Sequence, residues 1–282
     1  MWHGMGDNCC DDLSMGRVKL LIQKEIPNIY IHSIKIGETP TSDRSFGFFG
    51  NINKHIDQAC QQLQEDPALS NGYNGLGFSQ GGLFMRALLQ RCPYPKMKKL
   101  VTFGSPHAGV ASPPSCKQGD FLCEAMRRSI SNGVYSYYIQ NSIIQAQYYK
   151  DPKRIDEYLK NSIFLPYINN EIEVNQTYID RIKQLEKFVV IKFTLEKMID
   201  PVESTWFGFY GKNGNPLPLQ DTDLYKQDRL GLKYLDEKDK IDFLELETLH
   251  MQIPDHYLVE VASKYFKDPA PEIPDFFVQA YN

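Results

Sequence analysis

The stretch Tyr73-Asn74-Gly75-Leu76-Gly77-Phe78-Ser79-Gln80-Gly81-Gly82 decides the fold. Residues 73–78 predict a short strand, and residues 81–91 predict a helix with one apolar face. Small residues at 77 and 81 let the strand and the helix approach closely, so that the serine between them takes a strained backbone conformation. Its hydroxyl then projects above the sheet, at the positive end of the helix. The pattern predicts that Ser79 is a nucleophile.

The neighbouring segments predict an α/β architecture. Alternating apolar and polar residues over 28–36 favour a strand, and so do the apolar runs at 99–103 and 188–193. Residues 51–64 place apolar side chains at helical spacing on one face. Strands that alternate with helices indicate a mostly parallel central sheet flanked by helices.

A long insertion separates two of these strands. The chain between 99–103 and 188–193 is longer than a simple crossover needs, and it is rich in Tyr and Ile. It forms either a largely helical cap over the site or ordinary helical packing with no role in substrate binding. We therefore assign 1–109 and 187–265 to the core and 110–186 to the insertion. The Pro-rich residues 266–282 predict an extended tail.

Composition excludes several classes of function. The chain of 282 residues carries a net charge of −4 and has no strongly basic stretch, which argues against a nucleic-acid partner. It has no apolar run of about 18 residues, so we expect no membrane span. The abrupt apolar opening at Met1-Trp2 leads us to expect that residues are missing before it.

The cysteines and one sequon bear on the cellular compartment. The six cysteines lack C-x-x-C spacing and an accompanying histidine cluster, so we expect no metal site. They form either disulfides, with about fifteen full pairings open, or buried reduced thiols. Asn175-Gln176-Thr177 is a candidate glycosylation site that fits a secretory route.

A nucleophilic serine needs a histidine base. In this fold the chain order is nucleophile, acid, histidine, so a base follows Ser79 with room for an acid between them. His250 and His256 satisfy this order. We favour His250, which follows the segment 241–246 in a loop, over His256, which lies at a predicted helix start.

The acid is expected at the carboxyl end of a parallel strand, where ligands bind in α/β sheets. Asp200 follows the strand 188–193, and Pro201 stiffens the turn after it. Asp221 and Asp223, in a polar loop, are the alternatives. We predict that Asp200 orients the histidine.

An oxyanion hole needs two backbone N–H donors. One donor is the residue after the nucleophile, here Gln80. The other comes from an early loop after a strand, and His3-Gly4-Met5-Gly6-Asp7 is such a loop. We predict the amides of Gln80 and Met5 as the two donors.

Motifs along residues 1–260 resemble the lysosomal palmitoyl-protein thioesterases of type 1, which have the α/β-hydrolase fold. Trp206-Phe207-Gly208-Phe209-Tyr210, shortly after Asp200-Pro201-Val202, is the most specific of these motifs. The others are Trp2 to Asp7 with Cys9-Cys10, Tyr73-Asn74, Gly77 to Gly82, Gln90 to Pro93, Ser162 to Leu165, Leu224-Tyr225, Gln227 to Leu232, and His250.

The resemblance implies roles for individual residues. It implies Ser79, Asp200 and His250 as the triad, and Met5 and Gln80 as oxyanion donors. It also implies that the inserted helices form an apolar acyl-binding cap. The implied disulfides are Cys9–Cys10, Cys60–Cys92 and Cys116–Cys123.

The implied activity is hydrolysis of long-chain acyl thioesters, chiefly palmitoyl, from cysteines of proteins or peptides, without a cofactor. The implied location is lysosomal or secreted, and peripheral contact with lipid stays open. The turn Gly104-Ser105-Pro106-His107 departs from the family and looks like that of general lipases. The alternatives are therefore a lipase or carboxylesterase acting on fatty acyl oxyesters, or a catalytically inactive protein that binds acyl chains.

Overall fold

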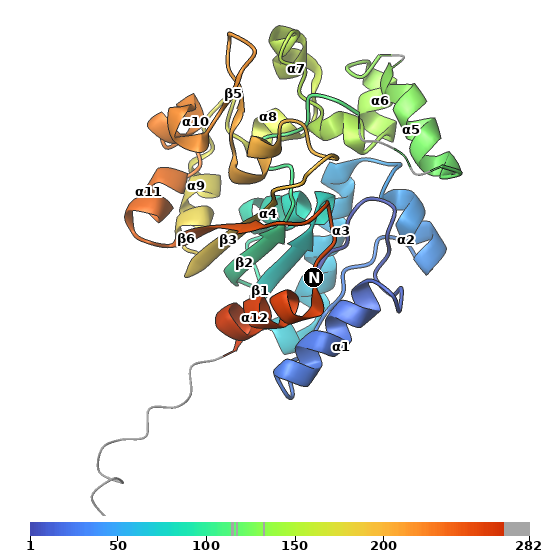
Figure 1. Ribbon diagram of the computed structural model, residues 1–282, viewed down its shortest axis with the longest axis vertical. Helices are drawn as coiled ribbons and strands as arrows, with labels where there is room; N and C mark the ends of the chain where they lie inside the picture. Colours follow the sequence, from blue (N-terminus) through green and yellow to red (C-terminus); the bar gives the residue numbers. More distant parts are fainter. Residues whose placement is uncertain (114–115, 117, 132, 268–282) are drawn as a thin grey trace, which may run out of the picture.

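The computed structural model describes residues 1–267, except 114, 115, 117 and 132 (Figure 1). A four-stranded sheet in the order β1-β2-β3-β6 forms its centre, and every neighbouring pair is parallel. The strands are β1 (Tyr73–Phe78), β2 (Met97–Phe103), β3 (Lys187–Phe193) and β6 (Ile241–Leu246). Helices cover both faces, so the predicted α/β-hydrolase architecture is confirmed.

Alternate strand residues feed two apolar layers, because neighbouring side chains of a strand point to opposite faces. On one face the strands pack against α1 (Met15–Glu25) and α12 (Asp255–Phe266), which lie against each other. On the other face they pack against α3 (Ile52–Glu65), α4 (Gln80–Arg91) and α9 (Gln176–Lys183). Most of β3 and the second halves of β1 and β2 are therefore buried on both sides, which matches their apolar runs, whereas the edge strand β6 is only partly buried.

The segment between β2 and β3 contains helices but no extended strand among its described residues. Its part from α5 to α8 lies beyond one end of the sheet (Figure 1), whereas α9 covers a face of the sheet next to α4. Whether it acts as a cap stays a prediction at this point. Its elements before α9 are α5 (Phe121–Ser131), α6 (Tyr137–Ser142), η2 (Gln145–Tyr148), α7 (Ile155–Asn161) and α8 (Leu165–Ile168).

The remaining elements lie in loops around the sheet. Before β1 there are α2 (Pro40–Phe46) and η1 (Pro67–Leu69). The connection from β3 to β6 contains η3 (Val202–Trp206), β4 (Phe209–Tyr210), β5 (Pro216–Leu217), η4 (Leu219–Asp221), α10 (Asp223–Lys226) and α11 (Leu232–Glu237). Among the described helices, none is both long and apolar enough to cross a membrane.

Two expectations from the sequence differ from the structure or fall outside it. Residues 28–36 form no regular strand: the segment is hydrogen-bonded to Met1 through His32 and Ile34 and to the side chains of Gln62 and Asp43, while Trp2 occupies the place beside β1. Of the predicted tail at 266–282, residues 268–282 lie outside the described residues, and Phe266 still belongs to α12.

The three cysteine pairings that the resemblance implies are all present. Cys9 is bonded to Cys10, Cys60 of α3 to Cys92 at the end of α4, and Cys116 to Cys123 of α5. The Cys60–Cys92 bridge closes the longest loop, with a sequence separation of 32, and ties together two helices that cover the same face of the sheet.

We predict that this long-range bridge stabilises the fold most. In the chain-entropy account, replacing Cys60 and Cys92 together by Ala costs about 3–4 kcal/mol. Replacing Cys116 and Cys123, separated by 7 residues, costs about 2–3 kcal/mol. Urea unfolding without reductant measures both. A larger loss from the short-loop variant would contradict the prediction.

Candidate active site

Ser79 occupies a sharp turn between β1 and α4. Its backbone has φ 51° and ψ −125°, a conformation that a non-glycine residue rarely adopts. The turn closes only because its neighbours lack side chains. A Cβ at Gly77 would lie 2.3 Å from the Gly82 Cα, and a Cβ at Gly81 would lie 2.3 Å from the His3 carbonyl oxygen. This is the strand–turn–helix geometry of a nucleophile elbow.

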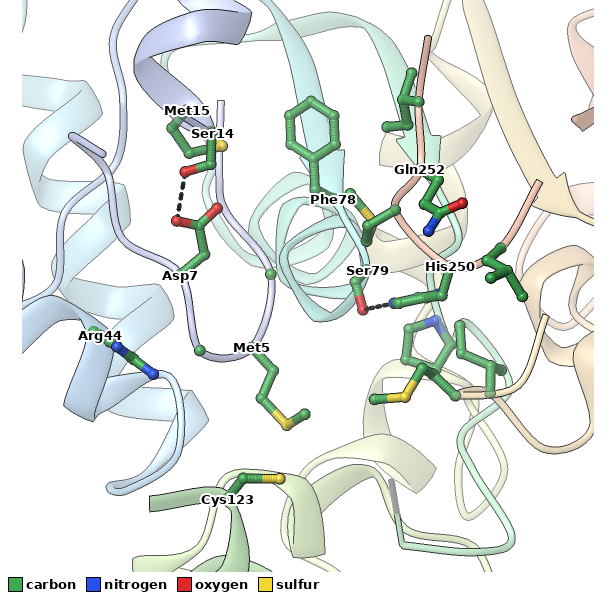
Figure 2. Close-up of a pocket in the computed structure, with 18 of the residues that line it drawn as sticks. Met5, Asp7, Ser14, Met15, Arg44, Phe78, Ser79, Cys123, His250 and Gln252 are labelled. Carbon is green, nitrogen blue, oxygen red and sulfur yellow. Dashed lines mark hydrogen bonds between the residues drawn. The ribbon is translucent and has the colours of Figure 1, made fainter. Parts of the chain in front are cut away.

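His250 lies beside Ser79, as predicted. Its Nε2 is 2.9 Å from the Ser79 Oγ (Figure 2), whereas His256 is exposed on α12. The His250 Nδ1 is 2.6 Å from Glu196 Oε2. A carboxylate can only accept a hydrogen bond, so Nδ1 carries the proton and Nε2 accepts the hydrogen bond of the serine hydroxyl. The arrangement can therefore deprotonate Ser79.

The Glu196 side chain is buried and held by backbone amides. Its side chain is 1% exposed, and its Oε1 accepts the amides of Lys197, Met198 and Ile199 at 2.8, 2.6 and 3.3 Å. Burial by itself would raise the pKa of this carboxyl. The hydrogen bond and charge of His250, together with the backbone amides, outweigh burial and lower the pKa. Glu196 is therefore an ionised acceptor for the imidazole.

The prediction that Asp200 orients His250 is wrong. The Asp200 carboxylate accepts hydrogen bonds from the Tyr210 hydroxyl at 2.5 Å and the Ser112 hydroxyl at 2.8 Å. The physical reason is distance along the chain: β3 ends at Phe193, and Glu196 lies in the first turn after it. By position 200 the chain has already turned toward the insertion. Glutamate close to the strand end was the signal that the sequence offered.

The loop that starts at His3 passes directly against the nucleophile. A Cβ at Gly4 would lie 3.2 Å from the Ser79 Cβ. The loop turns through Gly6, whose φ is +77°, with the Asp7 amide 3.4 Å from the Gly4 carbonyl oxygen. Met5 lies at the tip of this turn, in a loop next to Ser79 (Figure 2), and Gln80 follows Ser79 as the first residue of α4, so the two predicted oxyanion donors come from separate segments beside the nucleophile.

A buried ion pair holds this loop. Asp43 of α2, 1% exposed, accepts the amides of Cys9 and Ile36 at 2.8 and 2.7 Å, and the His3 Nε2 lies 3.2 Å from the same carboxylate. Burial would lower the pKa of His3, but the contact with Asp43, its charge and the Gly4 carbonyl together raise it. Asp43 could not be identified from the sequence, because no pattern in α2 indicates that its carboxylate contacts His3, Cys9 and Ile36.

A pocket of about 730 Å³ opens at Ser79 and His250, within the usual range for small-molecule sites. Arg44 and Asp120, an ion pair at 3.5 Å, lie along it. The side chain of Met5 extends from its loop toward Cys123 of the insertion (Figure 2). The apolar residues that line the pocket include Met5, Phe48, Phe78, Pro106, Val110, Tyr148, Ile199 and Leu249.

Two further features concern cofactors and modification. The part of the chain that the structure describes holds no group of three or more His, Cys, Asp or Glu side chains placed to bind a metal ion. Asn175 is exposed at the start of α9, so its side chain is accessible in the folded protein. Glycosylation there stays a prediction.

The His3–Asp43 pair predicts a pH-dependent stability. A histidine whose pKa is higher in the folded than in the unfolded state stabilises the fold fully below its unfolded pKa, about 6.5, and this contribution is lost as pH rises through the folded pKa. Unfolding free energy should therefore fall more steeply with rising pH in the parent than in His3→Gln, with the exposed His256→Gln as control. Equal slopes between about pH 5.5 and 8.5 would contradict this.

Comparison with known proteins shows the family to which the chain belongs. The chain is 46% identical to palmitoyl-protein thioesterase 1 of Caenorhabditis elegans over 269 residues, 94% of this chain and 90% of the relative. It is 35% identical to palmitoyl-protein thioesterase 3 of Dictyostelium discoideum, over 90% of this chain and 84% of that protein. The lysosomal thioesterase PPT2 homolog of Drosophila melanogaster is 30% identical over 68% of this chain and 66% of its own length. The pattern of the palmitoyl protein thioesterase family matches residues 1–250, and the chain belongs to this family.

Proposed function

We propose that the protein hydrolyses long-chain acyl thioesters, chiefly palmitoyl, on cysteines of proteins or peptides. The observation that carries this proposal is the hydrogen-bonded series Ser79–His250–Glu196 at the mouth of a largely apolar pocket. The names of the relatives supply the substrate class, which a triad by itself does not define.

In the acylation step, the Ser79 Oγ attacks the thioester carbonyl carbon while His250 Nε2 takes its proton. Glu196 accepts the Nδ1 hydrogen bond, keeps the required tautomer and stabilises the imidazolium. The amides of Met5 and Gln80 stabilise the negative oxygen of the tetrahedral intermediate. The C–S bond then breaks, and the imidazolium returns the proton to the departing cysteine thiolate.

In the deacylation step, His250 takes a proton from water, and the resulting hydroxide attacks the acyl-enzyme carbonyl. Collapse of the second intermediate breaks the bond to Ser79, which regains its proton from His250. The products are the fatty acid and the free cysteine thiol, and no cofactor enters the balance.

Further features support the substrates and the compartment. An apolar pocket suits an acyl chain, because each methylene group that it buries contributes about 0.8 kcal/mol of favourable transfer free energy. Three disulfides favour an oxidising route, and one relative carries the word lysosomal in its name. We therefore infer S-palmitoylated proteins or peptides as partners and a lysosomal or secreted location.

The first prediction from this mechanism concerns the acid. Glu196→Gln should lower kcat on a palmitoyl thioester by roughly 10³–10⁴-fold, because the imidazolium loses its counter-charge and the tautomer is no longer fixed. The matched change Asp200→Asn should cost far less, and Ser79→Ala should abolish acyl-enzyme formation. Steady-state kinetics and mass spectrometry of the trapped acyl-enzyme measure these effects. If Asp200→Asn had a lower kcat than Glu196→Gln, Asp200 would be restored as the acid.

The second prediction concerns the bond that is cleaved. A palmitoyl-cysteine peptide should be hydrolysed with a higher kcat/KM than the matching palmitoyl-serine peptide, which has the same chain length and sequence. A higher kcat/KM on the oxyester would favour the lipase or carboxylesterase alternative. Hydrolysis of neither, together with no labelling of Ser79 by a fluorophosphonate, would favour an inactive acyl-binding protein.

A further inference from the structure

The side chain of Gln80 has contacts that the mechanism above does not use. It is 2% exposed, and its Nε2 donates to the Gly47 carbonyl at 2.9 Å. Its Oε1 accepts from the Tyr148 hydroxyl at 3.0 Å and from Gln145 Nε2 at 2.9 Å. Gln80, whose backbone amide we propose as an oxyanion donor, is therefore held through both the Nε2 and the Oε1 of its side chain.

The same cluster reaches the other proposed donor. Gln145 Nε2 also donates to the Gly47 carbonyl, at 2.8 Å. Gly47 ends α2 and lies against the loop of Met5: a Cβ placed on Gly47 would be 3.6 Å from the Gly6 amide nitrogen. These side chains thus contact Gln80 directly and the Gly47 carbonyl, and Gly47 in turn lies beside the loop of Met5.

Tyr148 is part of the hydrogen-bonded cluster of Gly47, Gln80, Gln145 and Tyr148, and it also lines the pocket. It comes from η2 in the insertion, and its side chain lines the pocket while its hydroxyl reaches Gln80. Burial raises the pKa of this phenol, although the side chain of Gln145 acts in the opposite direction. The hydroxyl therefore stays protonated and donates at every pH at which the enzyme would work.

We propose that Tyr148 is a positioning residue that links filling of the apolar pocket to the alignment of the Gln80 amide, and so makes turnover depend on acyl chain length. A long chain packs against the Tyr148 ring and restricts the ring's motion, and the hydroxyl passes this restraint to Gln80. Binding energy from the remote end of the substrate is then used in the transition state rather than only in binding. This inference rests on the proposed thioesterase function.

Few other hydrogen bonds could replace the one between the Tyr148 hydroxyl and Gln80. Among the described residues, Gln145 Oε1 is buried without a hydrogen-bond partner, so Gln145 is held only through its Nε2. Removing the Tyr148 hydroxyl still leaves Gln80 Oε1 with one donor, Gln145 Nε2. Tyr148→Phe should therefore fold, while the Gln80 side chain loses its direct connection to the pocket wall.

The experiment compares the parent with Tyr148→Phe on octanoyl, dodecanoyl and palmitoyl thioesters of one peptide. In the parent, kcat should rise with chain length. In Tyr148→Phe, kcat on the palmitoyl substrate should fall about tenfold, less than the loss of an oxyanion donor itself, which costs about 10²–10³-fold. On the octanoyl substrate kcat should fall less than on the palmitoyl substrate, and KM for the palmitoyl substrate should stay close to that of the parent.

Tyr135→Phe is the matched control. Tyr135 is also a buried tyrosine of the insertion, but among the described residues its hydroxyl is hydrogen-bonded to the Tyr149 carbonyl and the Asp151 amide alone, and Tyr135 is not among those that line the pocket. This variant should keep the chain-length profile of the parent. Thermal unfolding of both variants checks that each one folds.

The outcomes are distinct. An equal loss of kcat on all chain lengths, or a change in KM alone, would overturn the link between the pocket and Gln80. If the parent does not cleave thioesters, the thioesterase function fails instead. Alkyl fluorophosphonates of different chain length then test the link without a thioester bond, and equal effects of Tyr148→Phe on short-chain and long-chain labelling of Ser79 would overturn it.

Discussion

The close contact between β1, α4 and the segment at Trp2-His3 is the constraint on which the rest of the site depends. Side chains at Gly77 or Gly81 would collide with backbone, so three pieces of chain meet at a separation that only glycine allows. Ser79 takes its strained conformation because this packing leaves no other path. The same contact brings the loop of Met5 beside the nucleophile.

Parallel strands then supply the partners of Ser79. The carboxyl ends of β1, β3 and β6 lie at one edge of the sheet, so the residues that follow them converge even though they are distant in sequence. Ser79 follows β1, Glu196 follows β3 and His250 follows β6. The insertion contributes Val110 and Tyr148 to the lining of the pocket at Ser79.

Local pattern and chain order were sufficient for most of the fold, although the alternation at 28–36 predicted a strand that the structure lacks. The elbow, the flanking helices, the parallel strands and the choice of His250 all follow from periodicity and order. The sequence was insufficient where the role of a residue depends on the direction in which its side chain points. Asp200 and Glu196 both follow β3, and only the folded turn shows that Asp200 faces Tyr210 and Ser112. The buried contacts of Asp43 and Tyr148 join segments that no local pattern connects.

Gly47 enters the structure through its carbonyl oxygen, and Met5 and Gln80 would enter catalysis through their amides. These backbone groups are common to almost every residue type, so the residue at position 5 can change while the path of the chain stays the same, whereas Gln80 is also held by its own side chain. Relatives that have lost sequence similarity here can therefore retain the same electrostatic environment. An inhibitor aimed at these amides would meet a target that point mutations alter with difficulty.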